Sequence, residues 1–523
     1  MELPEILAVL MVVAICALLL IGYPVALTLA GVALSFACLG HLLGAMNLSL
    51  LGALPQRIFG VMTNEVLLAI PLFIFMGVML ERSRIAEDLL EAMGRLFGPW
   101  RGGLAISVTL VGVLLAAAKG VVGATTITLA LITLPTMLRH GYDPRLAAGT
   151  VAATATLAQI MPPATVLVLL GDQLNTAYQA AQLAEGRFAP DSVSVGDLFA
   201  GAVVPALMLV VLYLVFQVAV ALLKPNACPP ILPQANPQKG SEASHLAGAL
   251  AAPLLLIVVV LGSILGGLAT PTEAAAIGAF GALLLTARRI DGARSWPIVL
   301  ATVAIIGALL WRTLVDPRFG RASPGILDQA GVFGGLALLA ALAIGAFAAT
   351  VAVQRAGVLQ PVLSSTTQMT SMIFTILIGA TLFSLVFRGL RGDDLVQRAL
   401  ADLPGNGAVL AAMVAMFLLG FVMDAFEIIF VVVPIVAPAL LKMPAVHPVW
   451  LGVMMAMNLQ TSYMHPPLGP TLFYLRGAAP PEITTLHIYV GIIPFVVIQI
   501  AALGLLWTVP ELATWLPHAL YGG

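Results

Sequence analysis

The chain has 523 residues, of which 61% are hydrophobic and only 9% are charged, and its mean hydropathy is +1.07. Soluble domains carry roughly 25% charged residues, so this composition cannot cover a surface in water and indicates a membrane protein. The formal net charge of −1 argues against nucleic acid as a partner. The three cysteines, Cys16, Cys38 and Cys228, have no spacing typical of a disulfide or a metal site.

The first predicted element is an apolar run over residues 5–22. It follows Glu2 and Glu5 instead of the basic residues that open a secretory signal, so we expect a retained transmembrane helix. A span needs roughly 20 apolar residues. Further candidate spans follow at 24–44, 65–80, 103–138, 195–223, 247–269, 272–287, 296–313, 331–353, 370–388, 406–441 and 487–509. The stretches 103–138 and 406–441 are too long for one simple helix and predict either a broken helix or two short ones.

Two more apolar stretches, 146–171 and 449–476, each contain a Pro-Pro pair beside hydroxyl and amide residues. The charged stretches 81–100 and 389–403 predict amphipathic helices that lie along the membrane surface. Residues 224–246 are rich in Pro, Asn, Gln and Ser and are typical of a linker between two halves.

An internal repeat relates the two halves of the chain. When Pro162 is placed on Pro466, an offset of 304 residues, Gly120 falls on Asp424, and a segment of about 65–175 repeats as about 367–477. Identities are few, but the order of span, surface helix, long broken span and Pro-Pro hairpin is kept. The predicted fold is therefore an all-α polytopic membrane protein with two inverted repeats and re-entrant hairpins.

The repeat divides the chain into six predicted parts, each a run of consecutive residues. They are N-terminal scaffold helices at 1–64, a first repeat at 65–223 with hairpin 1 at 146–171, the linker at 224–246, scaffold helices at 247–366, a second repeat at 367–509 with hairpin 2 at 449–476, and a C-terminal tail at 510–523.

The Pro-Pro pairs indicate transport. Proline ends a helix by removing a donor and clashing with the preceding turn. Irregular backbone inside a membrane is tolerated only where protein or a water-filled cavity satisfies it. Inverted repeats with such breaks are typical of secondary transporters, in which freed carbonyls hold a cation such as Na⁺ and helix N-termini hold a carboxylate. The alternative is that each pair merely kinks an ordinary helix.

The candidate substrate contacts are the Pro-Pro pairs themselves and the polar residues that cluster beside them. They are Thr154, Thr156, Gln159, Pro162 and Pro163 in the first hairpin, and Asn458, Gln460, Thr461, Ser462, His465, Pro466 and Pro467 in the second. A threonine in a membrane helix is often only a packing residue whose hydroxyl bonds to its own backbone.

Charges inside apolar runs are a sharper signal, because each costs roughly 2.5–3.5 kcal/mol at the centre of a span. Three stand out: Lys119, Asp424 and Glu427. The alternative is that they face a polar interface between spans or pair with one another. Glu273 begins a predicted span, where it can simply cap the helix.

Several motifs together resemble the large membrane subunit of TRAP (tripartite ATP-independent periplasmic) transporters, the DctM-like family. The matching stretches are Gly141-Tyr142-Asp143, Gln159 to Pro163, Thr270 to Ala276, Gly420 to Asp424, and Asn458 to Ser462 running on to Pro466-Pro467. The resemblance covers nearly the whole chain. An extra segment near 290–330 places the chain with the longer branch, which includes carriers for α-keto acids and related carboxylates.

The resemblance implies a sodium-coupled elevator in the inner membrane, with a scaffold that holds a mobile transport domain. It implies a small membrane subunit (DctQ-like), a periplasmic substrate-binding protein and surrounding lipid as partners, and a small organic acid, such as a C4-dicarboxylate or an α-keto acid, as cargo. Na⁺ would bind beside the hairpins, at Asp424, Gly120, Thr461 and Gly469, and no other cofactor is implied.

Some positions differ from the family pattern. The family has a small hydroxyl residue where Lys119 stands and threonine where His465 stands, and alanine replaces its glycines at Ala155 and Ala158 and its serine at Ala164. Our hypothesis is that the Lys119 ammonium replaces a Na⁺ or balances the substrate carboxylate. His465 could add coupling to protons, since histidine titrates near neutral pH.

Two other functions remain open at this point. A stand-alone organic-anion symporter or Na⁺/H⁺ antiporter of related architecture would need no binding protein. A polytopic enzyme would need a catalytic constellation, yet the seven histidines are scattered without metal-ligand spacing. The sequence also has no Gly-rich loop ending in Lys that could cradle the phosphates of ATP. We therefore do not expect an enzyme.

Overall fold

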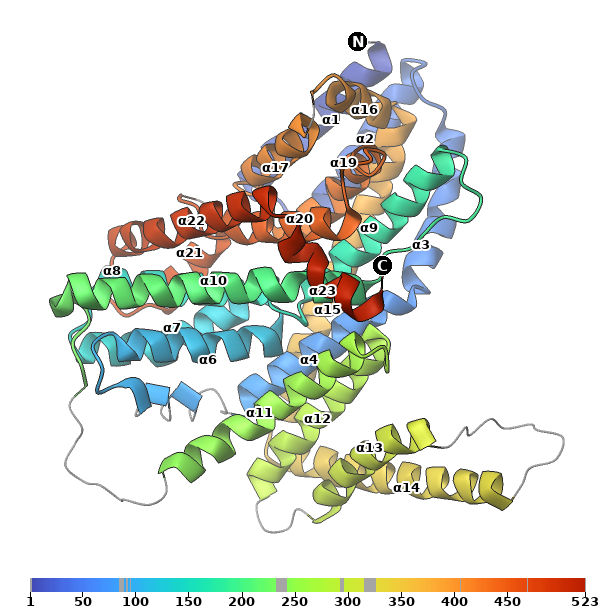
Figure 1. Cartoon of the computed structure of the whole chain (residues 1–523). Helices are drawn as coiled ribbons and strands as arrows, with labels where there is room; N and C mark the ends of the chain where they lie inside the picture. Colours follow the sequence, from blue (N-terminus) through green and yellow to red (C-terminus); the bar gives the residue numbers. More distant parts are fainter. Residues whose placement is uncertain are drawn as a thin grey trace.

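In the computed structural model of the chain (Figure 1), every regular element is a helix across the residues that the structure describes. These residues are 2–83, 89–90, 93–94, 96–231, 242–291, 296–314, 326–404, 406–467 and 469–522. The predicted all-α polytopic membrane fold is therefore confirmed.

Seven of the described helices are long and apolar enough to cross a membrane. They are α1 (Leu3–Ile21), α2 (Val25–Leu42), α7 (Val122–Arg139), α10 (Val195–Leu223), the Phe333–Arg355 part of α14 (Ile326–Arg355), α15 (Leu359–Gly389) and α22 (Thr485–Thr508). An eighth candidate span is a pair bent by 51°. Its elements are η1 (Leu48–Ala53) with α3 (Leu54–Met62), and η2 (Glu65–Leu68) with α4 (Ala69–Arg82).

One group of helices packs around α4 and α15. Besides spans already named, this group contains three further helices: α11 (Glu242–Leu265), α12 (Pro271–Asp291) and α13 (Trp296–Leu314). Helix α12 packs against α4, α11 and α14, while α15 packs against α2 and α4. The α13–α14 pair lies at the lower right of Figure 1. The expectation that Glu273 caps α12 is confirmed, because its carboxylate accepts a hydrogen bond from the Thr270 backbone N–H at 2.8 Å.

The repeat offset recurs in the helix boundaries. The first repeat holds α6 (Gly103–Lys119), α7, α8 (Pro144–Thr156), η3 (Leu157–Gln159) and α9 (Thr165–Ala184). The second holds α17 (Gly407–Leu419), α18 (Ala425–Val431), α19 (Val433–Leu440), α20 (Pro448–Ser462) and α21 (Pro470–Ala478). The starts of α6 and α17 are separated by the same offset as the two Pro-Pro pairs, and so are the starts of α8 and α20. Both long stretches are broken as predicted, after Lys119 and after Leu419.

Each hairpin packs on the terminal helix of the other repeat. Helix α8 of the first repeat lies along α22, and α20 of the second contacts α10. The α8–α22 contact depends on glycine, because an added Cβ on Gly149 would overlap the Gly491 carbonyl oxygen. Helix α23 (Glu511–Tyr521) follows α22 and packs on α10. The two repeats are thus interlocked around the hairpins.

A helix is present in the second stretch predicted to lie along the membrane surface, namely α16 (Gly392–Ala401), which packs near the start of α1. Its flanking Arg391 bonds to Glu2 at 2.9 Å, and Arg398 forms an ion pair with Glu5. The first predicted surface helix, at 81–100, lies partly outside the described residues. So do the linker at 224–246 and the extra segment near 290–330, whose described flanks belong to α13 and α14.

Candidate functional site

The two Pro-Pro pairs lie at the tips of two helical hairpins. The peptide bonds Pro162–Pro163 and Pro466–Pro467 are both cis. Each tip separates the helix that leads into it, α8 or α20, from the helix that follows it, α9 or α21. Pro162 and Pro163 are buried, whereas Pro466 and Pro467 are exposed, so the two tips have different surroundings in this structure.

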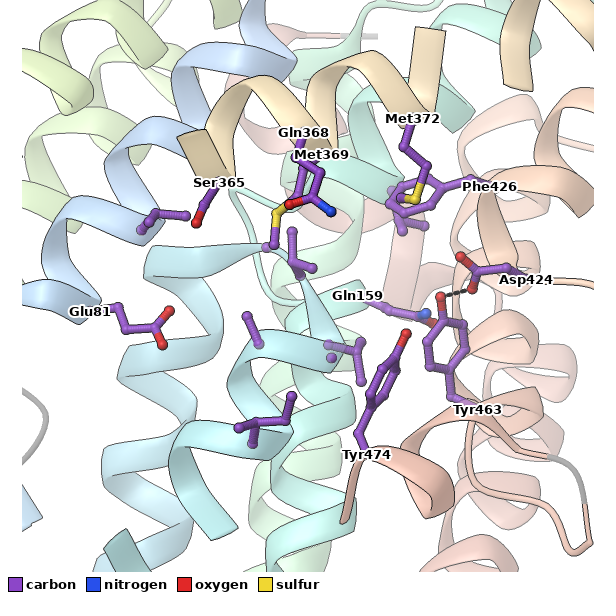
Figure 2. A pocket seen from close by; sticks show the side chains of 18 of the residues that line it. Glu81, Gln159, Ser365, Gln368, Met369, Met372, Asp424, Phe426, Tyr463 and Tyr474 are labelled. Carbon is purple, nitrogen blue, oxygen red and sulfur yellow. Dashed lines mark hydrogen bonds between the residues drawn. The ribbon is translucent and has the colours of Figure 1, made fainter. Parts of the chain in front are cut away.

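A cavity of ≈ 410 Å³ lies where the two tips, the break between α6 and α7, and the start of α18 meet helix α15 (Figure 2). Its polar lining comes from both repeats, from α4 and from α15: Glu81, Arg82, Gly120, Gln159, Ser365, Gln368, Asp424, Tyr463 and Tyr474. Apolar side chains, among them Val122, Met369, Met372 and Phe426, complete the wall. A cavity of this size suits a small organic molecule.

Asp424 is held at the start of α18 by local hydrogen bonds. Its carboxylate accepts from the Ala425 backbone N–H at 2.8 Å, and its own N–H donates to Glu427 Oε2 at 3.0 Å. The Tyr463 hydroxyl, from the second hairpin tip, donates to the same Asp424 carboxylate (Figure 2). These donors offset part of the cost of placing a carboxylate inside a membrane protein. Asp424 therefore presents a fixed acidic group to the cavity.

Gln159 is the matching polar group of the first tip. Its side chain is only 1% exposed, and neither amide atom has a hydrogen-bond partner among the described residues. Figure 2 shows it pointing toward Asp424 and Tyr463. Buried amides are nearly always hydrogen-bonded, so an unpartnered one beside a cavity indicates a place for a bound ligand, ion or water. Gln159 and Tyr463 are separated by the repeat offset and thus occupy equivalent positions.

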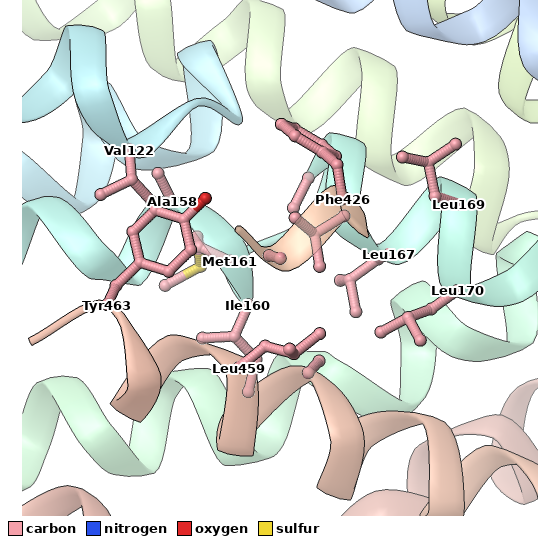
Figure 3. Close-up of a cluster of buried hydrophobic side chains, with 14 of the residues drawn as sticks. Val122, Ala158, Ile160, Met161, Leu167, Leu169, Leu170, Phe426, Leu459 and Tyr463 are labelled. Carbon is pink, nitrogen blue, oxygen red and sulfur yellow. The ribbon is translucent and has the colours of Figure 1, made fainter. Parts of the chain in front are cut away.

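An apolar cluster lies where the two hairpins meet and includes residues that line the cavity (Figure 3). Ile160, Met161 and Leu167 of the first hairpin are buried together with Leu459 of the second. Val122 and Phe426, which line the cavity, belong to the same buried core. These side chains keep water out from between the tips, which strengthens the polar interactions within the cavity.

Three other polar side chains predicted to contact substrate from the second hairpin form hydrogen bonds to nearby backbone carbonyls. The Asn458 amide donates to the Met413 carbonyl at 2.8 Å and so ties α20 to α17. The hydroxyls of Thr461 and Ser462 donate to the carbonyls of Met457 and Asn458, one turn back in their own helix. None of these three lines the cavity. Thr154, Thr156 and Gln460 are buried behind the tips as well.

His465 lies against α17 rather than in the cavity lining. Its ring stacks on Phe421 with centroids 3.7 Å apart and meets Phe417 edge-on at 4.9 Å. Nε2 lies 3.4 Å from the Phe417 carbonyl oxygen, and Nδ1 has no partner among the described residues. Lys119 is the last residue of α6, directly before the cavity residue Gly120, and its side chain lies outside the described part of the chain.

Oxygen atoms lie close to two of the positions predicted to bind sodium, one at Gly120 and two at Gly469, where both carbonyls also accept backbone hydrogen bonds. Gly120 has φ +60°, and a Cβ there would lie 3.1 Å from Thr165 Oγ1, a buried hydroxyl with no partner among the described residues. A Cβ on Gly469 would lie 2.5 Å from the Tyr463 carbonyl oxygen and 3.0 Å from that of His465. Carbonyl and hydroxyl oxygens at broken helices suit Na⁺, so the donor chemistry fits that ion.

Sequence reasoning missed six polar cavity residues: Glu81, Arg82, Ser365, Gln368, Tyr463 and Tyr474. The sequence predicts Glu81 and Arg82 in a surface helix, but in the structure they end α4. The repeat offset could have identified Tyr463, because it is the counterpart of Gln159. Tyr474 packs on the bare backbone of Gly123, where a Cβ would lie 3.0 Å from its ring. Ser365 and Gln368 belong to α15, outside the hairpins, and only the packing of the chain brings them to the cavity.

The family model described as tripartite ATP-independent periplasmic transporter, DctM component, matches residues 12–310 and 296–512. The C4-dicarboxylate TRAP transporter large permease protein DctM of Vibrio cholerae is 25% identical over 98% of both chains. Its namesake from Rhodobacter capsulatus is 26% identical over 96% of this chain and 97% of its own. The ectoine TRAP transporter large permease protein TeaC of Halomonas elongata is 23% identical over 97% of this chain and 98% of its own.

Among solved structures, the Alcanivorax borkumensis YdaH transporter is similar, with a TM-score of 0.54 and 15% sequence identity. The match covers 89% of this chain and 88% of that one. At this level of identity the likeness supports the fold alone.

Proposed function

This chain belongs to the DctM component family of tripartite ATP-independent periplasmic transporters, and from that premise we propose that it carries a small organic acid into the cell, driven by a sodium gradient. It is a multi-pass protein of the inner membrane, and its relatives are transporters rather than enzymes. The observation that carries the proposal is the cavity in which Gln159 and Tyr463, equivalent residues of the two repeats, face Asp424.

A carboxylate is the proposed cargo because the cavity offers hydrogen-bond donors together with an apolar wall. The Gln159 amide and the Tyr474 hydroxyl can donate to carboxylate oxygens, whereas the Tyr463 hydroxyl already donates to Asp424. Met369, Met372 and Phe426 provide apolar surface for a short carbon chain. The relatives carry different names, including C4-dicarboxylate, isethionate, ectoine and sialic acid transporters, so the family alone does not select one compound.

We place the coupling ion beside the tips, near Asp424, Gly120, Thr461 and Gly469. Support comes from the Asp424 carboxylate and from the unpartnered Thr165 hydroxyl beside Gly120. Replacement of one Na⁺ by the Lys119 ammonium, and proton coupling through His465, stay as proposals. An elevator movement is supported by the position of the cavity, which lies between the hairpins and α15.

Uptake into liposomes tests the proposal. The chain is reconstituted with its small membrane subunit and presented with periplasmic binding protein and labelled carboxylates, with and without a Na⁺ gradient. We expect uptake only with both the binding protein and inward Na⁺. Equal uptake without the binding protein would instead indicate a stand-alone symporter, and uptake driven equally by a proton gradient in Na⁺-free buffer would contradict sodium coupling.

Replacing Tyr463 with phenylalanine removes the hydroxyl that donates to Asp424. A hydrogen bond to a charged group contributes about 1.5–3 kcal/mol, so we expect the Na⁺ concentration for half-maximal uptake to rise by roughly tenfold or more. Tyr142→Phe is the matched control, because it removes a buried hydroxyl that accepts from the Leu104 backbone N–H at 3.2 Å, away from both tips and outside the cavity lining. Similar Na⁺ dependence in the two variants would refute a role for the Tyr463 hydroxyl.

A further inference from the structure

A group of buried polar side chains lies behind the hairpin tips. Thr156 is at its centre: its hydroxyl donates to the Ala153 carbonyl at 2.8 Å, and the Nε2 atoms of Gln460 and Gln499 each lie 3.4 Å from it. Gln499 Nε2 also donates to the Tyr213 hydroxyl at 2.8 Å. We call Thr156, Gln460, Gln499 and Tyr213 the inter-repeat polar cluster. All four side chains are fully buried.

The inter-repeat polar cluster joins both halves of the chain. Thr156 ends α8 and Tyr213 lies in α10, which belong to the first repeat, while Gln460 in α20 and Gln499 in α22 belong to the second. Thr156 and Gln460 are separated by the repeat offset of 304 residues. Equivalent positions of two repeats can meet only where the repeats face each other, so the cluster marks the centre of the interface between them.

The cluster lies one short helical turn behind the cavity. Gln159 comes three residues after Thr156, at the end of the 3-10 helix η3, and Tyr463 comes three residues after Gln460. A 3-10 helix has three residues per turn, so a shift of Thr156 is passed directly to Gln159. The relative position of Thr156 and Gln460 therefore sets the relative position of the two side chains that face Asp424.

Hydrogen bonds are needed here because the apolar packing is not selective. Residues 147–156 of α8 are alanine, glycine, threonine and one valine, so apart from the backbone contact at Gly149 the helix presents few shapes that could fix its register against α22. A buried polar group that loses its partner is costly, and a register shift of α8 would take the Thr156 acceptor away from both glutamine amides, leaving Gln499 with Tyr213 alone. The Oε1 atoms of Gln460 and Gln499 have no hydrogen-bond partner among the described residues. Bonds to these oxygens therefore cannot compensate for a lost bond to Thr156.

We propose that the inter-repeat polar cluster locks the two hairpin tips to each other, and that Thr156 and Gln499 are positioning residues for transport. They act through Gln159 and Tyr463 and do not touch the cargo. This proposal rests on the transport function proposed above. It assigns a role to Gln499, a residue of the last long span that does not line the cavity.

Hydrogen–deuterium exchange of the full chain, purified with its small subunit, tests the lock without any cargo. Loss of one net hydrogen bond should speed exchange of the backbone amides of residues 157–161, 164 and 463–465 by roughly fivefold. We expect this at both tips in Thr156→Val and in Gln499→Leu, and wild-type exchange in Thr156→Ser, which keeps the hydroxyl. If Thr156→Val does not fold, Gln499→Leu still decides the outcome.

Gln217→Leu is the matched control. Gln217 is also a fully buried glutamine and donates to the Thr109 hydroxyl at 2.6 Å, but both residues belong to the first repeat. Its loss should leave the exchange of the second tip unchanged. Exchange of the second tip within twofold of wild type in Gln499→Leu, or an equal acceleration in Gln217→Leu, would overturn the proposal.

Uptake by the same variants adds a functional test. We expect Gln499→Leu to raise the cargo concentration for half-maximal uptake by roughly fivefold, since one net hydrogen bond no longer holds the tips, with a smaller change in maximal rate. An unchanged half-maximal concentration with faster exchange would show that the cluster stabilises the hairpins without positioning them for transport, and would overturn that role. If the wild type carries no carboxylate, the proposed function fails, while the exchange result still decides whether the tips are locked.

Discussion

Asp424→Asn is expected to reduce sodium-driven uptake by roughly two orders of magnitude while leaving the protein folded. The substitution keeps the size of the side chain and an acceptor oxygen for the Ala425 N–H, which the carboxylate binds at 2.8 Å. It removes the negative charge that faces the cavity beside Tyr463. Losing a charged ligand costs about 3 kcal/mol, which corresponds to roughly a hundredfold in affinity.

The measurement is uptake into liposomes over a range of Na⁺ concentrations, together with the thermal stability of the purified protein. Glu273→Gln is the control, because Glu273 is an exposed carboxylate that caps α12 and lies outside the cavity lining. It should transport like the wild type. If Asp424→Asn retains the wild-type dependence on Na⁺, Asp424 is not part of the coupling site and functions only as the cap of α18.

The sequence was most informative where proline and glycine restrict the backbone. The Pro-Pro pairs and the residues around Gly120 and Gly420 break apolar stretches that would otherwise continue as helices, and the structure has its breaks there. The repeat offset follows from the positions of these prolines and glycines alone. It predicts the starts of α17 and α20 from those of α6 and α8 without any knowledge of side-chain packing.

The choice among polar residues could not be predicted in the same way. Thr461 and Thr156 look alike in the sequence, as hydroxyls shortly before a Pro-Pro pair. In the structure the Thr461 hydroxyl bonds only to its own helix, whereas Thr156 also contacts two glutamines from other helices. A threonine can always bond to a carbonyl one turn back, so only the approach of another helix distinguishes the two roles.

Contacts over long sequence distances explain the remaining omissions. Gln368 reaches the cavity because α15 packs against α4 and α18. Gln499 reaches Thr156 because α22 crosses α8, 343 residues earlier in the chain. Both glutamines stand in apolar helices without a local motif, and a helical period shows which residues share a face but not which helix covers that face.

Gly491→Ala is expected to lower the thermal stability of the protein and its uptake together. Gly491 in α22 lies directly against α8, and a Cβ at this position would overlap the Arg145 carbonyl oxygen. That oxygen belongs to backbone and cannot move aside like the end of a flexible side chain, so α8 and α22 must separate. Overpacking of this kind costs about 1–3 kcal/mol. The displaced helix carries Thr156 and leads to Gln159, so the cavity should be disturbed as well.

Gly504→Ala isolates the steric cause, because Gly504 lies in the same helix and a Cβ there meets no atom within 4 Å. The same chemical change should be neutral or stabilising at Gly504, since alanine favours a helix over glycine by up to about 1 kcal/mol. Thermal unfolding in detergent and uptake in liposomes are compared for the two variants. Equal melting temperatures would show that α8 and α22 are not in close backbone contact. A stable Gly491→Ala variant that has lost uptake would instead show that the α8–α22 contact serves the position of the first tip more than the stability of the fold.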